Sequence, residues 1–195
     1  MLFDLGGVLI ELGENPFPPS WLKDDTHFKL SDWFKSESAQ QFEKGLISAE
    51  DFAQAMKRDL SLSQSLDEII QEFTQWPIGH FSGNHDLLNT LQENYTLAVL
   101  SNTNELHWPR VLNEFEIPKY SQHIYSSHIL KMAKPSPDIY EYVLEDLNAS
   151  PETVIFFDDN QDNIQSAINV GIQGHLVKGP EELRNKLEEL GLLKL

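Results

Sequence analysis

Apolar positions recur along the chain with two spacings, one typical of strands and one typical of helices. Short runs rich in β-branched and aromatic residues predict buried strands at Leu97–Leu100, His123–Ser126, Thr153–Phe157 and His175–Val177. Helical patterns separate these runs. Because strands that alternate with helices favour a parallel sheet covered by helices, we expect an α/β fold of Rossmann-like architecture.

Cap residues indicate where several of the helices begin. Ser136 and Ser150 each precede a proline, and proline is favoured at the first position of a helix. Gly179 likewise precedes a proline, ahead of a helix expected over Glu181–Leu190. These signals predict three helices in the second half of the chain.

Residues 14–80 break the alternation, since only helical patterns occur there. The expected helices are Leu30–Phe42, Phe52–Leu60 after a capping signal at Ser48, and Leu66–Trp76 after Ser63. A helical insertion directly after a first strand predicts a cap over a binding site. We therefore expect residues 14–80 to form a helical cap, and residues 1–13 and 81–195 to form the α/β core. The proline-containing stretches Leu12–Pro19 and Pro77–Asn84 are the expected hinges.

Composition limits the classes of protein that fit. The chain has 195 residues and 40% hydrophobic content, enough for one full core or a core with a small subdomain. Its 31 acidic and 14 basic residues give a net charge of −17, which argues against nucleic-acid binding and means that an anionic substrate needs a local cationic site. The chain has no cysteine, so disulfides, thiolate metal sites and thiol catalysis are excluded.

The hydropathy pattern also bears on location. No apolar stretch approaches the roughly 18 residues of a membrane span, and no basic segment precedes an apolar one at the start of the chain. We therefore expect no membrane association and a cytoplasmic protein.

Four short polar signals stand in a fixed order along the chain, three of them at the ends of apolar runs. They are Asp4 within Phe3–Val8, Ser101-Asn102 after Leu100, Lys134 before Pro135, and Asp158-Asp159 after Phe157. Since the carboxyl ends of parallel strands meet at one edge of the sheet, we expect Asp4, Ser101 and Asp158 to lie there. An acid, a hydroxyl, an ammonium and an acidic pair are the groups that metal-assisted phosphoryl transfer needs.

The charges of this set predict a cation. Asp4, Asp158 and Asp159 with one lysine leave a net charge of about −2, which would exclude a phosphate dianion. A divalent ion brings the site close to neutral, and hard oxygen ligands suit Mg²⁺. Taken singly, each signal has a plain structural alternative, because an acid or Ser-Asn after a strand often caps a turn, and lysines are commonly solvated. Lys131 is the local alternative to Lys134, which we prefer because a residue before proline favours an extended conformation.

The order and placement of these four signals resemble the haloacid dehalogenase-like hydrolase superfamily, and within it the phosphatases with a small helical cap. Residues 42–52, FEKGLISAEDF, resemble the cap segment of the sugar-phosphatase and epoxide-hydrolase amino-terminal phosphatase branch. The resemblance covers essentially the whole chain. It implies a Rossmann-like sheet with an inserted helical cap, Mg²⁺ as cofactor, and hydrolysis of a small phosphorylated metabolite, for example a sugar phosphate.

The resemblance also implies roles for the matching residues. Asp4 would be the nucleophile that forms an aspartyl-phosphate. The Ser101 hydroxyl and the backbone N–H groups from Asn102 onward would hold the phosphoryl oxygens, and Lys134 would screen the transferred group. The implied metal site consists of Asp4, the carbonyl of Gly6, Asp158 and Asp159, with Asn163 in support.

Gly6 departs from the usual pattern of the family. Most phosphatases of this superfamily carry a second aspartate two residues after the nucleophile, where it protonates the leaving alcohol and then activates water. General acid–base catalysis of this kind is worth about 10² to 10⁴-fold. Gly6 can supply a carbonyl to the metal but no proton. His80, His27 or a residue of the cap could take the place of the missing acid.

Three other functions use similar groups. Dehalogenases of the superfamily work without metal and lack the paired acids, and phosphoacceptor signalling domains carry their acidic pair first and their lysine last. The order of signals here argues against both. The remaining alternative, motivated by Gly6, is a catalytically weakened member that binds phosphorylated ligands or a protein partner without efficient turnover.

Overall fold

The computed structural model describes residues 1–22 and 33–193, and its centre is a five-stranded parallel sheet in the order β5-β4-β1-β6-β7. The strands are β1 Leu2–Phe3, β4 Ala98–Ser101, β5 His123–Ser126, β6 Ile155–Asp158 and β7 Gln173–Leu176. In the register of the sheet, Leu2 pairs with Ala98 on one side and with Phe156 on the other. Strand β1 is therefore central, with later strands on both sides, and ligands of such sheets bind beyond the carboxyl ends at this switch point.

The predicted α/β fold is confirmed. Strand β5 covers the predicted residues, whereas β4, β6 and β7 are each displaced by one or two residues. Both β4 and β6 extend onto a polar residue, Ser101 and Asp158, because these residues still pair with the neighbouring strands. The polar residues at the strand ends are thus fixed by the sheet itself.

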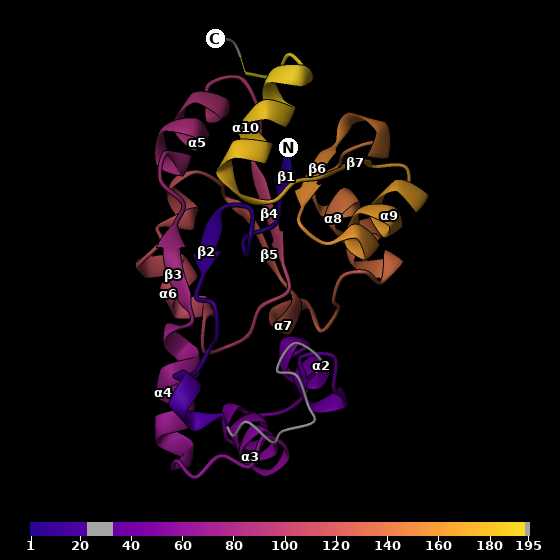
Figure 1. Cartoon of the computed structure of the whole chain (residues 1–195). Helices are drawn as coiled ribbons and strands as arrows, with labels where there is room; N and C mark the ends of the chain where they lie inside the picture. The colour runs from indigo at the N-terminus through magenta and orange to yellow at the C-terminus, as the bar shows by residue number, and fades with distance from the viewer. Residues whose placement is uncertain (23–32, 194–195) are drawn as a thin grey trace.

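Helices cover both faces of the sheet (Figure 1). Helices α5 Asn84–Gln92, α6 Trp108–Asn113 and α10 Gly179–Glu189 pack on one face, and α8 Pro137–Asp146 and α9 Gln161–Asn169 pack on the other. Successive strand residues point to opposite faces. Phe157 therefore joins the cluster with α5, α6 and α10, whereas Phe156 joins the cluster with α8 and α9. Both phenylalanines are fully buried.

Two of the three predicted helix starts are close to the observed ones. Ser136 precedes Pro137 at the start of α8, as predicted, and α10 begins at Gly179, two residues before its predicted start. The prediction at Ser150 is wrong, because only the 3-10 turn Pro151–Thr153 follows it. Strand β6 begins at Ile155, which leaves room for no more than one turn. A second and a third 3-10 turn cover Pro19–Trp21 and Ile117–Lys119.

Before β4, the chain forms helices α2 Glu37–Glu43, α3 Ala49–Asp59 and α4 Leu66–Gln75. The hydroxyl of Ser48 caps α3 as predicted, accepting from the backbone N–H of Asp51. The cap of α4 is Ser65 and not Ser63, because Glu68 lies three residues after Ser65 and completes a capping box with it. The predicted helix over residues 30–42 falls partly outside the described residues, and α2 begins after the cap residue Ser36.

These three helices have a hydrophobic cluster of their own. It contains large buried side chains from the described residues between 17 and 73, among them Trp33, Phe42, Phe52, Met56 and Phe73. The rings of Phe42 and Phe52 stack with their centroids 4.0 Å apart. Figure 1 shows α2 and α3 beyond the short helix α7 Ser127–Leu130, which directly follows β5 at the carboxyl edge of the sheet.

A two-stranded antiparallel ribbon, which the sequence did not predict, connects the sheet to these helices. Strand β2 Ile10–Leu12 pairs with β3 Pro77–His80, and Ile10 lies opposite His80. Pro77 stands at the first position of its strand, where its missing N–H costs no ladder hydrogen bond. The ribbon overlaps both stretches expected to be hinges. In the described part of the chain, no helix has the length and apolar character needed to cross a bilayer.

Candidate active site

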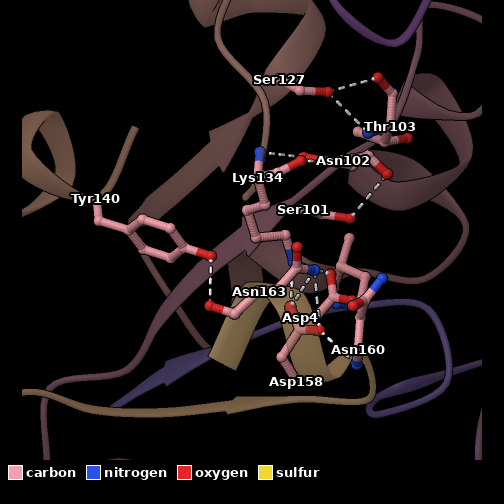
Figure 2. A network of polar contacts seen from close by, with 11 residues as sticks. Asp4, Ser101, Asn102, Thr103, Ser127, Lys134, Tyr140, Asp158, Asn160 and Asn163 are labelled. Atoms are coloured by element: carbon pink, nitrogen blue, oxygen red, sulfur yellow. Dashed lines mark hydrogen bonds and ion pairs between the residues drawn. The ribbon is translucent and has the colours of Figure 1, made fainter. Parts of the chain in front are cut away.

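Asp4, Lys134 and Asp158 form the centre of a polar cluster at the carboxyl edge of the sheet. Asp4 directly follows β1 and Asp158 ends the adjacent strand β6, so both side chains leave the sheet at the same place. The ammonium nitrogen of Lys134 lies 2.9 Å from Asp4 Oδ1 and 2.6 Å from Asp158 Oδ2 (Figure 2). All three side chains are buried. The structure thus brings together three of the residues selected from the sequence.

Asn102 fixes the loop that carries Lys134. Its Oδ1 accepts from the backbone N–H of Lys134 at 2.9 Å, and its Nδ2 donates to the carbonyl of Lys134 at 2.9 Å. The side chain of Asn102 is therefore used in positioning the lysine. The Ser101 hydroxyl, which lines the same cavity, is the side-chain group of this pair that can face a ligand. Lys131 lies outside the cluster, because its ammonium donates to the carbonyl of Gly45.

Asp158 is held by four hydrogen bonds. Its Oδ1 accepts from the backbone N–H of Asn160 at 2.8 Å and from Asn163 Nδ2 at 3.0 Å. Its Oδ2 accepts from Lys134 at 2.6 Å and from Asn163 Nδ2 at 3.1 Å. The hydroxyl of Tyr140 in turn donates to the carbonyl of Asn163 at 2.9 Å (Figure 2). Asn163 therefore supports the cluster, as expected from the sequence, by orienting Asp158.

The three carboxylates fit a divalent cation. One oxygen each of Asp4, Asp158 and Asp159 lies within 4.8 Å of the others. Gly7 has a φ of +71°, and a Cβ there would lie 2.5 Å from Asp159 Oδ2, so glycine allows this carboxylate to approach the loop after β1. Three hard oxygen donors around one point suit Mg²⁺.

The two oxygens of Asp4 are in different environments. Oδ1 accepts from the backbone N–H of Leu5 at 2.7 Å and from Lys134. Oδ2 has no hydrogen-bond partner among residues 1–22 and 33–193. One carboxylate oxygen is thus anchored, which leaves the other available for a ligand.

The electrostatics show that one ammonium does not balance the carboxylates. Burial raises the pKa of Asp4 to about 7, with Asp158 and Asp159 adding to the rise and Lys134 opposing it. Burial also raises the pKa of Asp159, and the charge of Asp158 adds to this. For Lys134, burial works against the charged form, but Asp4 and Asp158 outweigh it and raise the pKa. The lysine is held charged, while the excess negative charge favours a bound cation.

Two cavities meet at this cluster, and their linings differ. The polar cavity, about 540 Å³, is lined by Asp4, Lys134, Asp159 and Asn163 among others. The apolar chamber, about 260 Å³, is lined mainly by aromatic and aliphatic side chains, including Phe42, Phe52, Phe73, Val111 and Phe115. Both cavities share the residues Gly6, Leu12, Phe34, Glu43, Trp76, Ser101 and Asn102. The two cavities therefore border each other directly beside the cluster.

The polar side chains of the apolar chamber mostly bond to the protein. Asn104 Oδ1 accepts from the backbone N–H groups of Leu106 and His107, each at 3.1 Å. His107 Nε2 lies 2.7 Å from the carbonyl of Phe73, and burial lowers the pKa of His107 to about 4. The histidine is therefore neutral near pH 7, and the chamber offers a ligand few free polar groups.

Among the groups considered as replacements for a missing acid at Gly6, His80 lies away from the site. It is on β3, its Nε2 is 2.7 Å from the carbonyl of Phe115, and it lines neither cavity. His27 lies outside the described residues. Glu43, at the end of α2, lines both cavities. Glu43 was not among the residues predicted for the site, although it lies in the segment that resembles a cap. Its position two residues before Gly45 is the one signal in the sequence that distinguishes it.

Comparisons with known proteins agree with this geometry. The family model for haloacid dehalogenase-like hydrolases matches residues 1–177. A D-ribitol-5-phosphate phosphatase of Bacteroides thetaiotaomicron is 23% identical, covering 96% of this chain and 95% of the relative. A sesquiterpene phosphatase of Aspergillus oryzae is 30% identical, covering 89% of this chain and 86% of the relative.

A solved structure is similar over nearly the whole fold. It is a HAD family enzyme of Bacteroides thetaiotaomicron in complex with magnesium and inorganic phosphate, with 31% identity and a TM-score of 0.76. The match covers 91% of this chain and 92% of that one. The resemblance noted in the sequence is thereby confirmed: the chain belongs to the haloacid dehalogenase-like hydrolase family, and it is an enzyme whose relatives include phosphatases.

Proposed function

We propose that the protein is a Mg²⁺-dependent phosphomonoester hydrolase that acts on a small phosphorylated metabolite through an aspartyl-phosphate on Asp4. The observation that carries this proposal is the Lys134 ammonium between Asp4 and Asp158, with an oxygen of Asp159 within 4.8 Å of oxygens of both acids. The phosphatases among the relatives, and the similar enzyme bound to magnesium and phosphate, support the same reaction.

In this proposal each residue has a definite task. Asp4 attacks phosphorus with Oδ2, because Oδ1 is anchored by Leu5 and Lys134. The Lys134 ammonium reduces repulsion between the nucleophile and the phosphoryl oxygens. The Ser101 hydroxyl and the backbone N–H of Asn102 hold those oxygens, whereas the Thr103 N–H already donates to the Ser127 hydroxyl at 2.9 Å. The Asn102 side chain positions Lys134 and does not contact substrate.

We assign the Mg²⁺ site to Asp4, Asp159 and the Gly6 carbonyl as direct ligands. When bound, the ion supplies positive charge against the phosphate and the carboxylates. Asp158 lies in the same group of oxygens, but its four hydrogen bonds fit better with orienting Lys134 and closing one side of the site. Asn163 supports Asp158 from α9.

We further propose that residues 14–80 act as a cap over a core of residues 1–13 and 81–195. Two observations support this division. Helices α2, α3 and α4 bury a hydrophobic cluster separate from those of the sheet, and the apolar chamber is lined by residues of both parts. The expected location in the cytoplasm stays a prediction.

The metabolite class has two candidates. A sugar phosphate is favoured by the ribitol-phosphate phosphatase, which is similar along nearly the whole chain. An ester with an apolar organic part is favoured by the lining of the chamber, where Asn104 and His107 already have protein partners. Polyol hydroxyls that enter such a chamber would lose their hydrogen bonds to water, and the lining would replace only part of them.

The test is a panel of phosphate esters assayed for phosphate release with Mg²⁺ and with chelator. The panel pairs sugar and polyol phosphates with aryl and long-chain alkyl phosphates. Turnover that requires Mg²⁺ supports the proposal, and the preferred member identifies the class. Binding of these esters without release of phosphate from any of them would instead support the weakened, binding-only alternative.

A further inference from the structure

We propose that Glu43 is the general acid and base of the site and supplies from the cap the proton that Gly6 cannot. This inference rests on the proposed phosphatase function and adds a catalytic residue to it. It is drawn from the position of Glu43 between the two cavities, from the way its helix is fixed to the core, and from its surroundings.

Glu43 borders the space where the scissile bond of an ester would lie. The phosphoryl group belongs in the polar cavity beside Asp4 and Lys134, and the organic part has the apolar chamber open to it. The oxygen that joins the two must lie where the cavities meet, and Glu43, Gly6 and Ser101 line both. Of the residues that line both cavities, Glu43 is the acid.

The end of α2 is fixed to the core at three points. The hydroxyl of Ser127 donates to the carbonyl of Glu43 at 2.6 Å, and Lys131 donates to the carbonyl of Gly45 at 2.6 Å. Gly45 has a φ of +60°, and a Cβ there would lie 2.5 Å from the carbonyl oxygen of His128. A backbone held this closely against α7 gives Glu43 a defined place over the site, as an acid catalyst requires.

The surroundings of Glu43 suit a proton donor near neutral pH. Burial raises the pKa of its carboxyl to about 7, while the charges of Lys134 and Lys44 oppose the rise. The other charged or titratable groups lining the cavities are Lys35, Asp4 and Asp159 on the polar side and His107, with its lowered pKa, in the chamber. No hydrogen bond to the Glu43 carboxyl is formed by residues 1–22 and 33–193. The group is thus able to donate to a ligand.

The proton balance of the reaction follows from this assignment. In the first half, Asp4 forms a bond to phosphorus as the bond from phosphorus to the ester oxygen breaks, and the Glu43 carboxyl transfers its proton to that oxygen, releasing the alcohol. In the second half, Glu43 carboxylate accepts a proton from water as the water oxygen attacks phosphorus and the bond from phosphorus to the Asp4 oxygen breaks. Inorganic phosphate leaves, Asp4 is restored as the carboxylate, and Glu43 is again protonated.

The experiment compares Glu43→Gln with the wild type on two phosphates that differ in leaving group. An alkyl phosphate has a poor leaving group and needs the acid, whereas a nitrophenyl phosphate departs without one. We expect the variant to lose about 10² to 10⁴-fold in kcat on the alkyl phosphate, the range that general acid catalysis provides, and a much smaller factor on the aryl phosphate. Glu50→Gln, the same change at an exposed position of α3, is the matched control and should behave as wild type on both.

The pH profile provides a readout that a structural role would not move. With the wild type, the kcat for the alkyl phosphate should fall as the pH rises through about 7, because Glu43 loses the proton that it donates. Glu43→Gln should lack this limb, and Glu43→Asp, which keeps a carboxyl, should retain it with lower activity. Thermal melts check the fold: since the raised pKa makes ionised Glu43 unfavourable in the folded state, the Gln variant should melt no lower than wild type at pH 8.

Each other result overturns the inference. An equal loss on both phosphates, no loss on either, or an alkaline limb that persists in Glu43→Gln would mean that Glu43 is not the acid. Failure of the proposed function is distinguishable, because it appears as absence of Mg²⁺-dependent turnover of the aryl phosphate by the wild type. A Gln variant that fails to melt cooperatively would show that Glu43 is needed for the fold, which also contradicts the proposal.

Discussion

The two cavities that meet at Gly6 are built from different parts of the molecule and by different forces. The polar cavity is lined by Asp4 and Lys134, which are buried and joined with Asp158 by contacts of 2.9 and 2.6 Å. The apolar chamber is lined by aromatic rings from α2, α3 and α4 together with apolar side chains of the core, packed without direction-specific bonds. The polar cavity is thus defined by charged groups at fixed distances, and the apolar chamber is defined by the shape of its lining.

This difference teaches where specificity and chemistry reside. Charges at the ends of β1 and β6 are positioned by backbone pairing that any sequence with this sheet must keep. The liners of the chamber that come from the helical part, such as Phe42, Phe52 and Phe73, can change without disturbing that pairing, since they belong to a separate hydrophobic cluster. Glu43 belongs to both settings, because it is an acid of the helical part that lines the polar cavity as well as the chamber.

The largest effect is expected from Asp4→Asn, which removes the nucleophile of the polar cavity. Turnover of every phosphate should fall by more than about 10⁴-fold, because the isosteric amide cannot form the acyl-phosphate. The fold should persist: burial raises the pKa of Asp4 to about 7, so its ionised form is unfavourable in the metal-free folded state. Wild-type stability in chelator should therefore fall as pH rises from about 4 through 7, and the variant should show a smaller fall, because Glu43 and Asp159 still contribute to it through their raised pKa values.

Kinetics with an aryl phosphate and urea unfolding across that pH range provide the measurements. Residual activity of a few per cent would move Asp4 from nucleophile to metal ligand or turn cap. Asp4 would then contribute its charge to the site without forming a bond to phosphorus.

The second effect separates the acids of the polar cavity by their task. Mg²⁺ should stabilise the wild type by about 2.7 kcal/mol at 100 times its Kd. Asp159→Asn should weaken this stabilisation strongly, because we assign Asp159 as a direct ligand. Asp158→Asn should cost activity while preserving more of the Mg²⁺ effect, since Asp158 bonds mainly to Lys134, Asn160 and Asn163.

Melts of both variants with Mg²⁺ and with chelator are the measurement. Equal loss of the Mg²⁺ shift in the two variants would make Asp158 an equal ligand, as the sequence alone implied. No shift in the wild type would remove the metal from the proposed reaction.

The sequence predicted the polar cavity far better than the chamber, for a physical reason. Asp4, Ser101 and Asp158 follow short apolar runs, and the geometry of a parallel sheet brings such ends together whatever the rest of the chain does. Asn102 was selected for its backbone N–H as a phosphate contact, which stays a prediction; the pairing of its side chain with the backbone of Lys134 is a long-range contact that no local pattern encodes.

Other features depended on distant partners and were missed. The ribbon of Ile10–Leu12 and Pro77–His80 joins segments nearly seventy residues apart; both strands are short, and β3 carries proline and glycine. Glu43 belongs to an amphipathic helix, where an acid is normally a solvated residue. Only the docking of α2 onto Ser127 and Lys131 turns it toward the site.

The third prediction tests whether the general acid can be supplied by residue 6 of the core as well as by Glu43 of the helical part. Gly6→Asp in the Glu43→Gln background should recover alkyl phosphate turnover by about 10-fold or more, a part of the 10² to 10⁴-fold that an acid provides. The new Cβ would lie 3.2 Å from Leu12 Cδ1, a flexible side chain that can shift. In the wild-type background the same change should alter the ratio of aryl to alkyl turnover little, because Glu43 is already present.

Single-turnover rates with both phosphates measure this directly. Gly6→Ala in the same background is the control, since it introduces the Cβ without the carboxyl. If the alanine variant recovered as much as the aspartate variant, the recovery would come from a changed cavity shape and not from a proton donor.

The smallest effect concerns the contact that joins the two regions. The fully buried Ser127 hydroxyl accepts from the backbone N–H of Thr103 at 2.9 Å and donates to the carbonyl of Glu43 at 2.6 Å. Ser127→Ala leaves both backbone groups without this partner, so unfolding free energy should fall by about 1 to 3 kcal/mol. Ser82→Ala, in an exposed loop, is the control and should change stability by less than about 0.5 kcal/mol.

With Ser127→Ala, the alkyl phosphate should lose more turnover than the aryl phosphate, because a loosened α2 displaces Glu43 and leaves Asp4 and Lys134 in place. Equal loss on both phosphates would show that Ser127 acts on the polar cavity through Thr103, and the two regions would then be less separable than their linings indicate.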